Sequence, residues 1–158
     1  MDKELFMKIE ENLYGYFKDK NKITSVRKEI VTVSNLINTL ERNIQTCYGS
    51  IRTNIIAVGT TYVEREIEKA IDDMEKERAQ RVRKLYKLQC EERNLIYKIE
   101  KIESNISMLN EECKSFIELK YNKGLGVREV ALELNMSKNT AYGKRDELIN
   151  SIAESRCC

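Results

Sequence analysis

A group of hydrogen-bonding and cationic side chains lies close together near the end of the 158-residue chain, with no acidic residue among them. These residues are Ser137, Lys138, Asn139, Thr140, Tyr142, Lys144 and Arg145. Hydroxyl, amide and ammonium groups that share one short helix are suited to the edge of a nucleic-acid groove. The chemistry that this group predicts is recognition of DNA.

The residues just before this group predict two short helices joined by a tight turn. Ala131 is small enough for two helices to cross closely, and Leu134 and Met136 flank the turn. The corner needs a positive φ, which Asn135 tolerates better than any residue except glycine. Ser137 can then cap the second helix by accepting a backbone N–H bond. We interpret this as a helix-turn-helix, although a helical hairpin without a role in DNA binding has the same apolar spacing.

The elements around the turn complete a small helical module. A first helix would contain Phe116, Ile117 and Leu119 and stop at Lys123-Gly124, where glycine supplies a left-handed cap. The last helix would fold Leu148, Ile149 and Ile152 back onto Phe116 and Leu119.

The composition favours long helices, because proline is absent and 34% of the residues are charged. The net charge is only +2, so attraction to nucleic acid must come from a local patch. Five cysteines occur without a C-x-x-C pair and without histidine, which excludes the usual structural zinc sites. We expect no metal and no cofactor. The odd number of thiols indicates a reducing cytoplasm, and no apolar run is long enough for a membrane.

The first half of the chain predicts helices separated by breaks. Residues 3–19 place apolar side chains on one face, and residues 19–22 form a polar break. Residues 23–47 then carry apolar side chains at heptad spacing, as in a coiled-coil seam. Residues 49–61 are a connector whose conformation the sequence leaves open. Thr61 and Glu64 match a capping box at the start of the next helix.

That next helix is the long one, with heptads from Ile67 to Phe116. The seam is interrupted by charge at Arg78, Arg81 and Glu92, which either fix register or lie in a solvated span. The 23–47 helix would fold back antiparallel and cover about half of it. We expect the rest to pair with a second copy. The residues expected to form this contact are Leu88, Leu95, Ile99, Ile102, Ile106 and Leu109.

The predicted fold class is therefore all-α, with a long antiparallel helical hairpin or coiled coil followed by a C-terminal helix-turn-helix domain. Residues 1–115 would be the coiled-coil oligomerisation region, and residues 116–158 the DNA-binding domain. The role of Cys157 and Cys158 stays open.

The segment from Phe116 to Leu148 resembles the C-terminal domain of bacterial sigma factors, which reads promoter DNA. The resemblance rests on Val130-Ala131, on Leu134-Asn135-Met136-Ser137, on Thr140 and on Leu148. The whole chain, with its lysine- and glutamate-rich helical first part, resembles the RinA/ArpU family of phage late-gene transcriptional regulators.

The resemblance implies a role for each residue of the second helix. Ser137, Lys138, Asn139 and Tyr142 would face base edges, with Asn139 suited to adenine and Lys138 to guanine. Thr140, Lys144 and Arg145 would face phosphates, and Arg128, on the first helix of the pair, would hold the DNA backbone. The implied partners are double-stranded DNA and RNA polymerase, and the implied location is the cytoplasm of a bacterial host.

We therefore expect a sequence-specific transcriptional regulator that acts as a coiled-coil oligomer, with a dimer favoured. One alternative is a DNA-packaging adaptor resembling a phage small terminase, and another is a coiled-coil scaffold or inhibitor that does not bind DNA. An enzyme is not expected, because no histidine and no glycine-rich phosphate loop occur.

Overall fold

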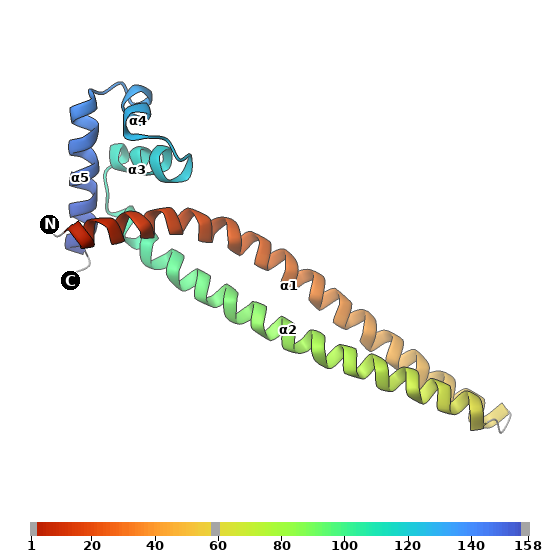
Figure 1. Cartoon of the computed structure of the whole chain (residues 1–158). Coiled ribbons are helices and arrows are strands. Elements are labelled where there is room, and N and C mark those ends of the chain that lie inside the picture. The colour runs from red at the N-terminus through yellow and green to blue at the C-terminus, as the bar shows by residue number, and fades with distance from the viewer. Residues whose placement is uncertain (1–2, 58–60, 156–158) are drawn as a thin grey trace. The chain divides into compact units, whose positions relative to one another are not determined.

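The computed structural model describes the backbone of residues 3–57 and 61–155, and the predicted all-α class is confirmed. Two long helices, α1 (Lys3–Ala57) and α2 (Thr61–Ser107), precede the short helix α3 (Glu111–Ile117) (Figure 1). A π-helical turn, η1 (Glu118–Asn122), leads into α4 (Val127–Glu133) and α5 (Lys138–Ser155). No strand forms in these described ranges.

Helix α1 is longer than the sequence pattern predicts. The expected break at residues 19–22 is wrong, and the expected connector at residues 49–61 is helical up to Ala57. A polar side chain does not by itself end a helix, because the backbone hydrogen bonds can continue past it. Proline would interrupt those bonds, and neither segment contains proline. The hydroxyls of Ser50 and Thr53 donate to carbonyls four residues earlier, at 3.1 and 2.7 Å. Residues 58–60 lie outside the described residues.

The chain divides into two compact units, which differ from the predicted regions 1–115 and 116–158. The first unit combines Met1–Ile23 with Asn94–Cys158, and the second is Thr24–Arg93. The start of α1 therefore belongs with the C-terminal helices and not with the hairpin.

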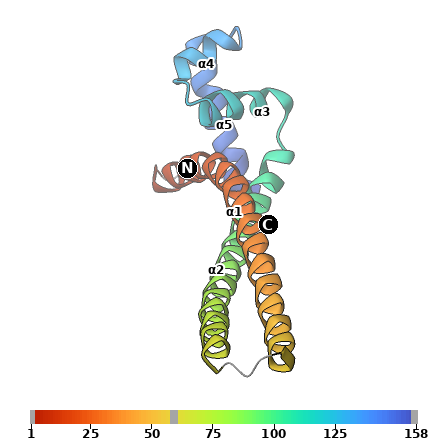
Figure 2. The ribbon, with the colours of Figure 1, turned by 90° about the vertical axis from the view of Figure 1, so that its right-hand side faces the viewer.

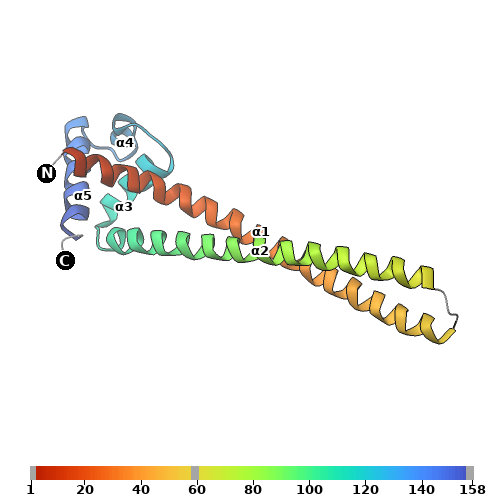
Figure 3. The ribbon, with the colours of Figure 1, turned by 60° about the horizontal axis from the view of Figure 1, so that its bottom comes forward.

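The second unit is an antiparallel hairpin of the later part of α1 and the earlier part of α2 (Figures 2 and 3). Ion pairs join Arg27 to Glu92 at 2.7 Å and Glu41 to Arg78 at 3.6 Å, so positions rise on one helix as they fall on the other. The expected seam of residues 23–47 is confirmed, because every apolar residue at a heptad position of the seam is buried or half-buried. The charged seam residues Arg78 and Glu92 are accommodated by these ion pairs.

The first unit has its main apolar core where the start of α1 meets the C-terminal helices. This core consists of Ile9, Leu13, Cys113, Ile117, Tyr121, Leu148, Ile149 and Ile152. A second cluster joins Phe116 to Val130, Ala131 and Ala141, with Leu119 packed against it. The expected packing of Leu148, Ile149 and Ile152 onto Phe116 and Leu119 is therefore wrong. The two ends of α5 face different partners, and the later end faces α1.

The long helix also ends earlier than its heptads predict. Helix α2 stops at Ser107, and Asn110 starts α3 by accepting a hydrogen bond from the backbone N of Cys113 at 2.8 Å. Glu111 and Glu112 follow in the first turn, where their negative charges interact favourably with the positive end of the helix dipole. A continuous seam to Phe116 was therefore a wrong prediction, because an asparagine cap interrupts it.

Candidate nucleic-acid interface

The turn between α4 and α5 has the backbone geometry that the sequence predicts. Asn135 adopts a φ of 51° and is the single non-glycine residue with positive φ in the described ranges. This conformation lets the backbone N of Met136 donate to the carbonyl of Ala131 at 2.9 Å, while the N of Asn135 reaches Leu132 at 3.2 Å. The predicted left-handed corner is confirmed. Gly124 adopts a φ of 74°, which confirms the predicted helix stop as well.

Small side chains bring α4 and α5 close together. Ala131 on α4 and Ala141 on α5 are both buried in one cluster with Phe116 and Val130. Because alanine adds only one carbon beyond the backbone, the two helices approach closely and Phe116 fills the space below them. The prediction that Ala131 faces inward at the crossing is confirmed.

Ser137 begins α5 as a helix cap, as predicted. Its Oγ accepts from the backbone N of Thr140 at 3.1 Å and lies 2.7 Å from the Thr140 hydroxyl. The Ser137 and Thr140 side chains thus hold the first turn of α5 in place. Because both hydroxyls contact each other, a DNA contact by either one would add to this capping bond or compete with it.

The first turn of α5 presents its polar side chains to solvent. Lys138, Asn139 and Thr140 are exposed, and Tyr142 is 37% exposed. The Lys138 ammonium lies 6.0 Å from the centre of the Tyr142 ring. Arg128 is exposed on the first turn of α4. These residues are accessible, so a DNA groove could meet them without rearrangement of the helices.

Lys144 and Arg145 are placed differently from the phosphate-facing role that the resemblance implies. The Lys144 ammonium pairs with Glu112 of α3 at 2.6 Å, and its side chain is 19% exposed. This hydrogen bond raises the pKa of Lys144 and lowers the pKa of the Glu112 carboxyl. The Arg145 guanidinium pairs with Asp146 at 3.0 Å and lies 4.9 Å from the centre of the Phe6 ring. Both cations are therefore already engaged within the protein.

Sequence patterns missed a buried polar network between α1 and η1. Lys120 is buried, and its ammonium lies 3.1 Å from the Tyr14 hydroxyl and 3.5 Å from a Glu10 carboxylate oxygen. The Tyr121 hydroxyl donates to Glu10 at 3.0 Å, and burial together with Glu10 raises the pKa of Tyr121. Glu10 and Tyr14 lie one helical turn apart on α1, and this spacing is the one sequence signal that they contact the same partner.

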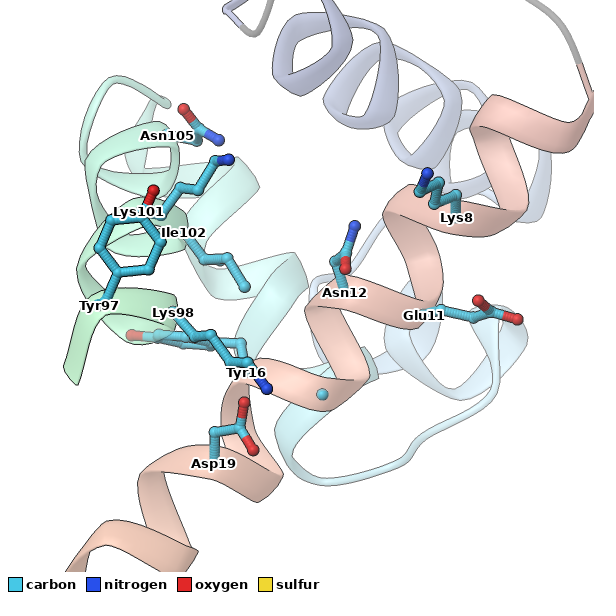
Figure 4. Close-up of a pocket in the computed structure, with 11 residues that line it drawn as sticks. Lys8, Glu11, Asn12, Tyr16, Asp19, Tyr97, Lys98, Lys101, Ile102 and Asn105 are labelled. Carbon is cyan, nitrogen blue, oxygen red and sulfur yellow. The ribbon is translucent and has the colours of Figure 1, made fainter. Parts of the chain in front are cut away.

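A shallow groove of about 770 Å³ lies between α1 and α2 in the same unit (Figure 4). Lys8 and Asn12 stand on its α1 wall, and Tyr97 and Lys101 stand on its α2 wall. Lysines and carboxylates both line it, so the groove has no single charge. The Tyr16 hydroxyl is already bonded to Glu103 at 2.8 Å. Nothing in this arrangement pairs a nucleophile with a base.

The residues expected to bind a second copy are instead covered by the chain itself. Leu88, Leu95 and Ile99 are buried. Ile102, Ile106 and Leu109 are half-buried against the core of the first unit. The premise that half of the seam lacks an internal partner is wrong, because these six residues are buried or half-buried within the chain itself.

The described residues contain neither a metal-binding cluster nor a helix that could span a membrane. No group of three histidine, cysteine, aspartate or glutamate side chains there lies close enough together to hold a metal ion. Among the described helices, none has an apolar stretch of the length that a bilayer crossing requires. No protein-family model, no curated protein and no solved structure matches the chain.

Proposed function

We propose that this chain is a sequence-specific DNA-binding transcriptional regulator of the phage late-gene type. The observation that carries the proposal is the first turn of α5. It follows a left-handed corner at Asn135, is capped by Ser137, and presents Lys138 and Asn139 to solvent. A helix held at a fixed angle with a polar first turn is the arrangement by which helix-turn-helix proteins enter the major groove.

The chemistry of the exposed residues supports recognition of particular bases. The exposed Asn139 amide can donate to N7 and accept from the N6 amino group of adenine. Lys138 can donate to the acceptors of guanine. Each such contact discriminates against a wrong base by about 1–3 kcal/mol. Arg128 would neutralise a phosphate and contribute to register.

One such module contacts little DNA, so we propose that two copies act together. Two modules double the number of base contacts and add a requirement for half-site spacing. Since the heptad seam is occupied within the chain, the contact between copies would use another surface. RNA polymerase is a further proposed partner, on the resemblance of residues 116–148 to the sigma-factor domain.

The proposal is tested by selecting duplexes from a random-sequence pool with the full chain, at a low and a moderate salt concentration. A regulator enriches one sequence family at both, and its affinity falls steeply with salt because phosphate contacts release counterions. A pool that stays random would support a scaffold that does not bind DNA. Light scattering of the protein on the enriched duplex gives the number of copies, and a ring of eight or more would support a DNA-packaging adaptor.

A further inference from the structure

The start of α1 lies beside α5 in the first unit (Figures 1 and 3). Phe6, Glu10 and Tyr14 are spaced four residues apart, so they lie along one face of α1. Glu10 and Tyr14 bind Lys120, and the Tyr14 ring meets the Tyr121 ring edge-on at 4.8 Å between centres. These contacts fix both the rotation and the register of α1 against the C-terminal helices.

With α1 held in this register, Phe6 lies close to Arg145 of α5. The Arg145 guanidinium is 4.9 Å from the centre of the Phe6 ring and 5.4 Å from the centre of the Tyr142 ring. The Lys138 ammonium is 6.0 Å from the centre of the Tyr142 ring. Cations and rings therefore alternate in one row, from the first turn of α5 to the first turns of α1.

This row restricts Tyr142 and Arg145 in different ways. Arg145 is 25% exposed at its side chain and is hydrogen-bonded to Asp146 through Nε and Nη2, at 3.2 and 3.0 Å. Two of its five N–H donors and its planar face are thus used within the protein. Tyr142 is exposed whereas Arg145 is half-buried, so of these two residues Tyr142 is the more accessible to a ligand.

We propose that Phe6 and Arg145 are positioning residues that hold Tyr142 for its contact with DNA, and that Arg145 does not itself bind a phosphate. This inference rests on the proposed DNA-binding function and adds to it. It makes the start of α1 part of the DNA-reading module, although Phe6 lies more than a hundred residues before Tyr142 in sequence.

The test uses the full chain and the duplex that the unmodified protein enriches most. Phe6→Leu keeps an apolar side chain against the core but removes the π face, and Phe6→Tyr keeps the ring. We expect Phe6→Leu to weaken binding about two- to five-fold, which is the effect of a lost cation–π contact at a partly exposed site. Phe6→Tyr should bind as the unmodified protein does. Equal binding by all three proteins would overturn the inference.

A second measurement separates positioning from direct phosphate contact. The slope of log affinity against log salt concentration changes by about 0.9 for each phosphate contact that is lost. We expect Arg145→Lys and Arg145→Ala to weaken binding with an unchanged slope, whereas Arg128→Ala should reduce the slope by about one contact. A reduced slope for Arg145→Ala would show that Arg145 binds a phosphate and would overturn the inference.

The proposed function and the inference about Phe6 and Arg145 are tested separately. If the unmodified chain enriches no duplex and shows no salt-dependent binding, the proposed function fails and this inference fails with it. If the unmodified chain binds and the Phe6 variants do not differ, this inference fails while the proposed function stands. Thermal unfolding followed by circular dichroism checks that Phe6→Leu and Phe6→Tyr have equal helical content, so an affinity difference between them reflects the ring.

Discussion

The left-handed corner at Asn135 allows a quantitative test of how the reading helix is held. An L-residue with a side chain beyond glycine pays about 1–2 kcal/mol in this region, and asparagine pays less than alanine. Asn135 is exposed, and its φ is 51°. Asn135→Ala should therefore destabilise the α4–α5 pair by about 1 kcal/mol. Asn135→Gly relieves the backbone strain of the folded state, but its greater flexibility also stabilises the unfolded state by about 0.4–1 kcal/mol. The two effects offset each other, so the stability of Asn135→Gly should be close to that of the unmodified protein.

Amide hydrogen exchange measures this difference at the helices themselves. The N–H of Val130 donates to Gly126 and that of Ala141 donates to Ser137, both at 3.0 Å, and both residues are buried. These amides exchange only when the helix pair opens. A loss of 1 kcal/mol corresponds to exchange about five-fold faster in Asn135→Ala. The amide of Val33, in the other compact unit, serves as the internal control and should not change.

The reasoning would be refuted if Asn135→Ala exchanged at the unmodified rate, or if Asn135→Gly exchanged faster than Asn135→Ala. Either result would mean that the corner is not the strained point of the turn. The close packing of Ala131 against Ala141 would then be the feature that holds the two helices.

Three further predictions concern the packing of the chain. Ile99→Asp should lower the free energy of unfolding by at least about 3 kcal/mol, because it buries an unpaired charge. Unchanged thermal unfolding together with a halved mass in light scattering would contradict this and would show that Ile99 packs against a second copy of the chain. Hydrogen bonds from Lys20 and Tyr16 lower the pKa of Glu103, so its contribution to stability exists above about pH 4.3 and is lost as the pH falls further. Glu103→Gln should accordingly flatten the loss of thermal stability between about pH 5 and pH 3, and a slope as steep as that of the unmodified chain would contradict this. Burial and Glu10 raise the pKa of Tyr121, so stability should fall as the pH rises above about 10 and the unfolded tyrosine ionises; Tyr121→Phe should show a shallower alkaline fall in thermal unfolding, and an equal fall would refute the buried neutral phenol.

The local features of the reading module could be predicted because each depends on a few adjacent residues. The positive φ of Asn135, the cap by Ser137 and the stop at Gly124 follow from backbone constraints that act within one turn. The apolar seam of residues 23–47 was visible because heptad spacing repeats over many turns. The inward position of Ala131 followed from its size.

The wrong predictions have more than one physical origin. The polar residues at 19–22 predict a break, but polar side chains are compatible with a helix and α1 continues through them. The heptad spacing continues through Asn110, and the local cap that Asn110 makes to the backbone N of Cys113 is what ends that pattern. The engagement of Lys144 by Glu112 is a contact between α5 and α3 that no local spacing encodes.

The most direct test of the central claim is the ratio of affinities for the enriched duplex and for a scrambled duplex of equal length and composition. The account predicts that Lys138→Ala combined with Asn139→Ala lowers this ratio at least about ten-fold, because each lost base contact removes about 1–3 kcal/mol of discrimination. Helical content should stay unchanged, since both side chains are exposed. A ratio equal to that of the unmodified chain would show that the first turn of α5 does not read DNA sequence.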